Sequence, residues 1–257
     1  MNLLIKLIFF ILLFSFHHPA YSIEEIVECN VKGCNTKYPK TYVLFQGNLK
    51  EDKNIIVWLP GGPGDQPYDR TIEGLENFRN YVSIINPYKL KSYNDFGPVP
   101  QAYGKDQPAR ILSVINWASS KGYKVWLGGH SNGGVRIVGL LKKYPDIQKN
   151  ILGVILSATH VCGGKGFNCI KVKSVKWNVN TLVLFHEGDH NKNTDPKRQR
   201  WMFDVIKKQN KKNTTLVGVK VTKGPKSVSS HNSGHHMFDY DRSAHINAIN
   251  KFLKNPK

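Results

Sequence analysis

After its first 22 residues, this sequence of 257 residues lacks any apolar run long enough to cross a bilayer. A spanning helix needs about 20 predominantly apolar residues. The apolar stretch at residues 7–16 is shorter, and a positively charged start at residues 1–6 precedes it. Ala20 and Ser22 then place small side chains where a signal peptidase reads its substrate. We therefore expect a signal peptide at residues 1–22, cleavage near Ser22, export to a periplasm or the exterior, and no transmembrane anchor.

Acidic residues are few, since 18 Asp and Glu oppose 37 Lys and Arg, and the formal net charge is +19. Such a charge attracts nucleic acid, anionic lipid or anionic polymers. The lysines are scattered, however, and no nucleic-acid-binding motif is present, so we expect no nucleic-acid partner. Their densest group, at residues 207–212, stands at the end of a predicted helix, where cations are favourable anyway. The charge remains compatible with an anionic or surface-bound substrate.

Cysteine is also scarce, with four residues in two close pairs, Cys29 with Cys34 and Cys162 with Cys169. Four cysteines in an exported protein suggest two disulfides, for which three connectivities exist. The local pairings are favoured because each closes a small loop that contains glycine. A zinc site is the weaker alternative, because thiolate zinc sites usually space their cysteines two to four apart in two knuckles, and neither pair does this.

No internal repeat, low-complexity tract or domain linker interrupts the chain, so residues 23–257 are expected to form one domain. Apolar strand-like segments alternate with segments of helical periodicity. This alternation predicts an α/β fold with a mostly parallel central sheet and helices on both faces. The predicted strands are residues 41–45, 54–59, 81–87, 123–127, 150–157, 181–185 and 214–221; the predicted helices are 106–117, 135–144, 195–210 and 240–253.

Ser131 is the centre of the strongest motif, a Gly-x-Ser-x-Gly pattern at residues 129–133. A β-rich run precedes the motif, and a helical run that ends at Pro145 follows it. A serine on such a strand–helix turn holds a strained backbone, so the residues two positions away must lack bulky side chains. A glycine-rich turn that merely joins a strand to a helix is the alternative. The context favours a nucleophile elbow with Ser131 as the nucleophile.

An acyl-transfer serine also needs an oxyanion hole with two N–H donors. Asn132 follows the nucleophile directly and would supply one donor. The second is expected from Gly61 or Gly62, because their glycine-rich loop follows a predicted strand and its backbone can approach a substrate closely. An ordinary turn at this loop is the alternative.

The acid of a catalytic triad should follow a strand beyond the elbow. Asp189, just after the predicted strand at 181–185, is the candidate. Glu187 is the next choice, but it lies closer to the strand and would point away. Asp195 is expected to cap a helix, and Asp146 to lie in the turn after a proline. A plain loop carboxylate is the alternative for Asp189.

The base should come late in the chain, before the closing helix. His235 is the candidate because Gly234 directly before it gives the loop freedom to present the ring. His236 and His231 are rivals, and histidines also occur in polar loops without any catalytic role.

In their order, these motifs resemble the α/β-hydrolase family over residues 41–253. The resemblance implies an eight-stranded, mostly parallel sheet and hydrolysis of esters, amides or thioesters by a Ser-His-Asp triad. The loop at residues 59–64 resembles the His-Gly-Gly-Pro-Gly loop of prolyl iminopeptidase-like members, but Pro60 stands in place of the histidine. Those members carry a lid domain before the acid. Only about thirty residues separate Ser157 from Asp189, so we expect an open, lidless site that favours bulky, polymeric or surface-bound substrates.

A competing pattern lies at residues 186–190, where His-Glu-Gly-Asp-His matches the zinc-protease signature. That signature needs a helix, on which its two histidines share a face. Here it follows a predicted strand and contains a glycine, so we expect no metal.

Together, these features predict an exported serine hydrolase, esterase-like or lipase-like, that needs no cofactor and acts on an ester or acyl substrate. The predicted catalytic residues are Ser131, Asp189 and His235, with Asn132 and Gly61 or Gly62 in the oxyanion hole. A serine peptidase of the same fold and a non-catalytic binding protein remain alternatives. The oligomeric state is not indicated by the sequence.

Overall fold

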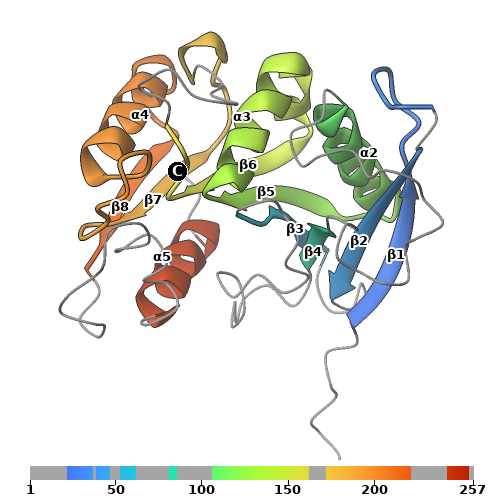
Figure 1. Cartoon of the computed structure of the whole chain (residues 1–257), viewed down its shortest axis with the longest axis horizontal. Coiled ribbons are helices and arrows are strands. Elements are labelled where there is room, and N and C mark those ends of the chain that lie inside the picture. Colours follow the sequence, from blue (N-terminus) through green and yellow to red (C-terminus); the bar gives the residue numbers. More distant parts are fainter. Residues whose placement is uncertain are drawn as a thin grey trace, which may run out of the picture.

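A computed structural model describes residues 22–36, 39–46, 53–61, 81–85, 106–161, 172–220 and 242–254. Within these residues the chain forms an eight-stranded sheet with the order β1-β2-β4-β3-β5-β6-β7-β8 (Figure 1). The strands from β4 to β8 in this order are mutually parallel, whereas β2 is antiparallel to both of its neighbours. The strands are β1 Ser22–Glu28, β2 Lys40–Gln46, β3 Asn54–Leu59, β4 Tyr81–Ile85, β5 Lys124–His130, β6 Ile151–Ser157, β7 Thr181–His186 and β8 Thr214–Val219.

Helices cover both faces of this sheet, as the sequence predicts. Figure 1 shows α2, α3 and α4 on one face and α5 on the other. Each side has its own apolar core; Ile246, Ile249 and Phe252 of α5, for example, pack with Trp58 and Trp126 of the sheet. The helices are α2 Gln107–Ser120, α3 Asn132–Lys143, α4 Pro196–Gln209 and α5 Arg242–Lys254, and two short 3₁₀ helices are η3 Pro145–Lys149 and η4 Val172–Ser174.

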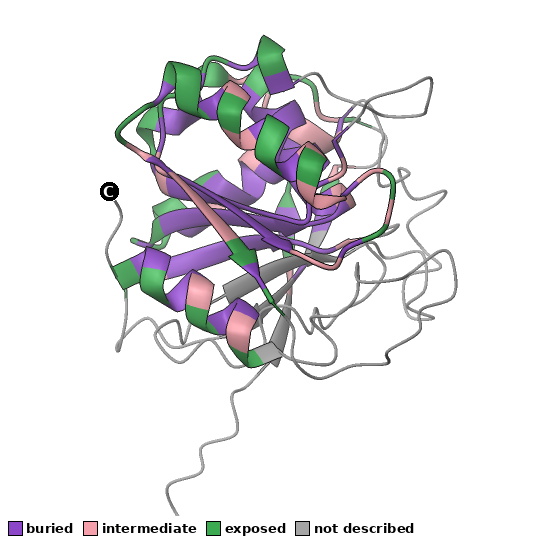
Figure 2. Ribbon diagram, turned by 90° about the vertical axis from the view of Figure 1, so that its left-hand side faces the viewer, coloured by how far each residue is buried: buried purple, intermediate pink, exposed green. Residues whose placement is uncertain are grey.

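The central strands are buried along nearly their whole length, which explains their continuous apolar sequences. Every residue of β7 is buried, and only the first residue of β5 is exposed. Figure 2 shows these buried strands between helices whose outer faces are exposed. A strand covered on both faces has no solvent side on which polar residues would alternate. The α/β prediction is therefore confirmed, and the described strands and helices match the predicted segments to within a few residues.

Strand β1 is the one described strand that the sequence analysis did not predict. Its seven residues contain three glutamates, and it forms the edge of the sheet, where only β2 pairs with it. An edge strand with one covered face tolerates such charges. Among the described residues, none of the helices has both the length and the apolarity that crossing a membrane would need.

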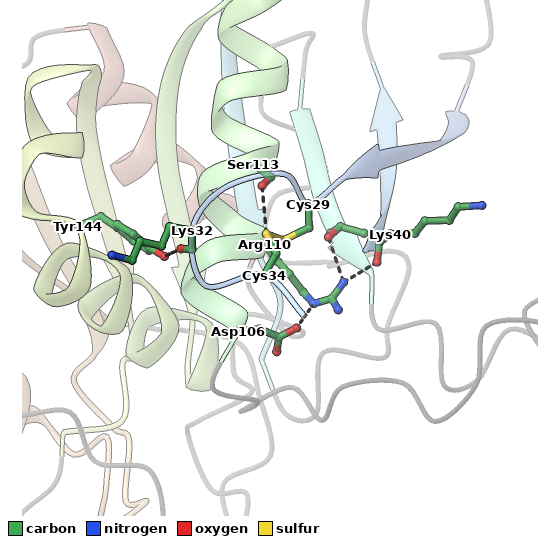
Figure 3. Close-up of a disulfide and its surroundings, with 9 residues drawn as sticks. Cys29, Lys32, Cys34, Lys40, Asp106, Arg110, Ser113 and Tyr144 are labelled. Carbon is green, nitrogen blue, oxygen red and sulfur yellow. Dashed lines mark hydrogen bonds and ion pairs between the residues drawn. A yellow bond between two sulfur atoms is a disulfide. The ribbon is translucent and has the colours of Figure 1, made fainter. Parts of the chain in front are cut away.

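The predicted disulfide between Cys29 and Cys34 is confirmed, with the two Cα atoms 5.7 Å apart. It closes a loop directly after β1, and the hydroxyl of Tyr144 donates a hydrogen bond to the carbonyl of Lys32 in that loop (Figure 3). Nearby, the buried Arg110 of α2 pairs with Asp106 at 2.7 Å. The disulfide loop is thereby joined to the helical layer. The other predicted pair, Cys162 with Cys169, lies outside the described residues.

Candidate active site

The candidate site lies at the carboxyl ends of the parallel strands, where the strand order reverses. From β3 the sheet continues to β4 on one side and to β5 on the other. In open α/β sheets, ligands bind at such a switch point, outside the carboxyl ends of the strands. Gly61 follows β3 and Ser131 follows β5, so the two predicted site residues flank this position.

Ser131 has the strained backbone that an elbow requires, with φ 53° and ψ −117° between β5 and α3. The glycines on either side explain how this turn is accommodated. A Cβ atom on Gly129 would lie 2.6 Å from the carbonyl carbon of Gly133, so the two glycines face one another. The predicted steric role of both glycines is confirmed, since neither position has room for a side chain.

Gly61 lies directly against Ser131. A Cβ atom on Gly61 would be 3.2 Å from the Cβ atom of Ser131 and 3.3 Å from Cδ2 of His130. Asn132 begins α3, so its amide stands at the positive end of that helix, where negative charge is favoured. The structure thus brings together two of the three residues proposed for an oxyanion hole. Gly62 lies outside the described residues.

His130 and Ser157 add a contact that the sequence analysis missed. Nδ1 of His130 and Oγ of Ser157 are buried and hydrogen-bonded at 3.1 Å. The backbone N–H of Ser131 also donates to the carbonyl oxygen of Ser157, at 2.8 Å. These bonds tie the end of β5 to the end of β6. The partners are separated by 27 positions in the sequence, and no local pattern announces such a pairing.

Asp189 is buried, with 2% of its surface exposed, at the same edge of the sheet after β7. Its Oδ1 accepts a hydrogen bond from the N–H of Asn191 at 2.8 Å. An ordinary loop carboxylate is solvated, whereas a buried one needs partners that satisfy its charge. Burial therefore favours a specific role for Asp189.

The rival carboxylates are occupied elsewhere. Glu187 forms an ion pair with Arg200 of α4 at 2.6 Å. Asp195 caps α4 by accepting from the N–H of Arg198 at 3.1 Å, as predicted. Asp146 is exposed and pairs with Lys149. None of these three is a buried carboxylate at the sheet edge.

The zinc-protease pattern is not helical. Its first histidine, His186, ends β7, and a turn at Glu187 and Gly188 follows. His186 is buried, its Nδ1 accepts from the N–H of Gly188 at 3.0 Å, and His190 is exposed. Burial lowers the pKa of His186, although the charge of Asp189 acts against this shift. The two histidines lack the shared helix face that the signature needs, and no cluster of metal-ligating side chains occurs among the described residues.

The predicted base, His235, and its rivals His236 and His231 lie in residues 221–241, outside the described residues. Residues 162–171, part of the interval in which a lid would stand, also lie outside them. The choice of base and the open, lidless site therefore stay predictions.

Comparisons with known proteins identify the fold. No family model and no curated protein matches the sequence. A thermophilic esterase from Thermogutta terrifontis superposes with a TM-score of 0.61 at 12% identity, over 90% of this chain and 98% of that chain. A CIB-like hydrolase from Thermoplasma acidophilum gives 0.58 at 16% identity, over 91% and 99%. Naproxen esterase from Bacillus subtilis gives 0.59 at 13% identity, over 91% and 92%. The chain has the α/β-hydrolase fold.

Proposed function

We propose that this protein is an exported serine hydrolase that cleaves carboxylic esters through an acyl-enzyme. The observation that carries the proposal is the backbone of Ser131, strained at φ 53° on a strand–helix turn and in contact with Gly61. Strain of this kind persists only where the surroundings hold it, and it gathers at functional sites. Two of the solved structures that share the fold are named esterases, which supports an ester substrate.

In the proposed mechanism, Ser131 attacks the acyl carbon while His235 takes its proton and passes it to the leaving group. Asp189 orients His235 and stabilises the imidazolium. The N–H groups of Asn132 and of Gly61 or Gly62 hold the oxyanion. Water then cleaves the acyl-enzyme: His235 takes a proton from the attacking water and returns it to Ser131. No cofactor takes part.

Export is supported by the disulfide between Cys29 and Cys34, because disulfides persist in oxidising compartments. The net charge of +19 supports an anionic or surface-bound substrate.

The test is turnover of short-chain p-nitrophenyl esters and of aminoacyl p-nitroanilides by the mature chain, with Ser131→Ala beside it. Ser120→Ala, at the exposed end of α2, is the matched control. We expect ester turnover that Ser131→Ala abolishes and Ser120→Ala leaves unchanged. Turnover of the anilides alone would favour a peptidase. Absence of any turnover in folded protein would favour a non-catalytic binding protein.

A further inference from the structure

The backbone of Ser131 is held from both sides, by the last residue of β6 and by a residue just after it. Its N–H donates to the carbonyl oxygen of Ser157 at 2.8 Å, and its carbonyl oxygen accepts from the N–H of His160 at 3.3 Å. The position of the serine therefore depends on the path of residues 158–161, which we call the β6 loop.

The β6 loop is itself strained and closely packed. Ala158 has φ 39° and, with Ser131, is one of the two non-glycine residues of positive φ among those described. Thr159 is 1% exposed, and a Cβ atom on Gly134 would lie 1.9 Å from its Oγ1. The loop thus touches the first turn of α3 directly beside the nucleophile. A strained loop keeps such a path only where other groups hold it.

Helix α4 supplies those groups. Nε2 of Gln199 donates to the carbonyl oxygen of Thr159 at 2.7 Å, and Nη1 of Arg198 donates to that of Val161 at 3.1 Å. Gln199 is fully buried, and its Oε1 has no hydrogen-bond partner among the described residues. A buried oxygen without a partner costs free energy, which offsets part of the stabilisation from the bond to Thr159. Gln199 therefore contributes little net stability, and its main effect is to fix the position of the β6 loop.

The same loop also contacts the segment that carries the candidate acid. The N–H of Val161 donates to the carbonyl oxygen of Asn193 at 2.9 Å. The N–H of Asn193 donates to Oδ1 of Asn191, also at 2.9 Å, and the N–H of Asn191 donates to Oδ1 of Asp189 at 2.8 Å. These hydrogen bonds, together with the short covalent segments between them, therefore connect Ser131 to Asp189 through the β6 loop.

We propose that Gln199 is a positioning residue for the nucleophile, which it holds in register with the acid through Thr159 and the β6 loop. The inference rests on the proposed function of Ser131. A small displacement of a reacting group lowers the rate steeply while substrate binding changes little. Loss of the bond from Gln199 should therefore lower kcat and leave KM nearly unchanged.

The test uses Gln199→Met, which keeps the length of the side chain and removes its donor. Gln148→Met is the matched control. Gln148 is another buried glutamine that donates to a loop carbonyl at 2.7 Å, that of Lys176. Gln148 precedes β6, and Lys176 precedes β7. This bond therefore lies at the amino ends of the parallel strands, whereas Ser131 lies at their carboxyl ends. Both variants lose a bond from a glutamine amide to a loop carbonyl, and Gln148→Met also removes the acceptor of the N–H of Asn178 at 2.8 Å. The control therefore carries at least as large a structural loss, and only the bond of Gln199 leads to the nucleophile.

With p-nitrophenyl acetate we expect Gln199→Met to lower kcat about tenfold with KM within about twofold, and to slow fluorophosphonate labelling of Ser131 in parallel. Gln148→Met should remain within about twofold of the wild type in both assays, even where its Tm falls as far as that of Gln199→Met or further. An equal decline in both variants, or no decline in Gln199→Met, would overturn the inference.

Gln199→Glu gives a second readout that a purely structural role would not produce. Burial raises the pKa of a carboxyl at this position, and only its protonated form can donate to Thr159. The rate of Gln199→Glu relative to the wild type should therefore rise several-fold as the pH falls from about 9 to about 6. A flat ratio would contradict the inference, and this series decides the question if Gln199→Met does not fold.

Failure of the proposed function would give a different result. Wild type that is not labelled at all would overturn the proposed function itself, whereas equal labelling of the wild type and Gln199→Met would overturn only the role of Gln199.

Discussion

Gly133 and Leu59 are in such close contact that a Cβ atom on the glycine would lie 1.8 Å from the carbonyl oxygen of the leucine. Leu59 is the last residue of β3, and Gly133 lies in the first turn of α3. The elbow helix is therefore seated on the backbone of the strand that leads to Gly61. Because Gly133 has no side chain, the turn at Ser131 can lie this close to the loop that contains Gly61.

We expect Gly133→Ala to lower the free energy of unfolding by about 3 kcal/mol or more and to abolish turnover, because β3 and α3 must separate. Urea unfolding and the ester assay measure the two effects. Gly122→Ala is the matched control, since Gly122 has φ 87° and no atom within 4 Å of its added Cβ. It should lose only about 1 kcal/mol from backbone strain and keep its activity. Equal losses in the two variants would show that close packing at Gly133 is not the cause.

Substitution of each carboxylate in turn should show whether Asp189 or Glu187 is the catalytic acid. We expect Asp189→Asn to lower kcat by about 10³-fold to 10⁴-fold, because an amide no longer holds the histidine in its catalytic tautomer. Glu187→Gln removes a partly exposed ion pair with Arg200 and should change kcat less than about threefold. Steady-state ester kinetics on both variants provide the comparison. A larger loss from Glu187→Gln would reassign the acid.

The buried His245 makes the fold sensitive to acid. Burial lowers its pKa to about 3, from the ordinary histidine value of 6.5. Between these values the unfolded chain binds a proton that the folded chain does not, so stability present above pH 6.5 is lost progressively as the pH falls. The slope approaches about 1.4 kcal/mol per pH unit for this one group. Burial shifts the pKa of His186 in the same direction.

His245→Met removes that titration and puts an apolar side chain of similar size in its place. We expect its free energy of unfolding to fall less steeply than that of the wild type between about pH 6.5 and pH 5, as measured by urea titration. Parallel acid limbs in the two proteins would show that His245 is protonated in the folded state as well.

Removal of the disulfide should affect stability more than catalysis. The bond between Cys29 and Cys34 closes a short loop that contacts α2 and Tyr144. The double variant Cys29→Ser with Cys34→Ser should lose about 2 kcal/mol, the value expected for so short a loop. Ester turnover well below the melting temperature should change less than about twofold. A large loss of turnover in the folded variant would place the disulfide loop in contact with the site.

Those features that depend on local chemistry could be predicted from the sequence. The Gly-x-Ser-x-Gly spacing at Ser131 reflects a steric need that the turn itself imposes, and Asp195 before a proline is typical of a helix start. The continuous apolar runs of the central strands follow from burial on both faces. The placement of Ser131 and Asp189 at one edge of the sheet then follows from the parallel order of the strands.

Other features depend on pairings between distant segments, and the sequence shows no sign of them. Strand β1 contains three glutamates and has no apolar alternation to announce it. Gln199 stands in an otherwise ordinary helical segment, and its bond to Thr159 spans 40 positions. Nothing in the elbow motif indicates that His130 bonds to Ser157, because this contact forms only when β6 pairs with β5. Such contacts are fixed by tertiary packing rather than by local propensity.

The central claim is that the strained Ser131 is an activated nucleophile, and covalent labelling of the mature chain with a fluorophosphonate tests it most directly. The account predicts a single adduct, located on Ser131 by mass spectrometry of tryptic peptides, that is lost in Ser131→Ala and in His235→Ala. Absence of an adduct in folded protein with its disulfide intact, or an adduct that persists in Ser131→Ala, would contradict it.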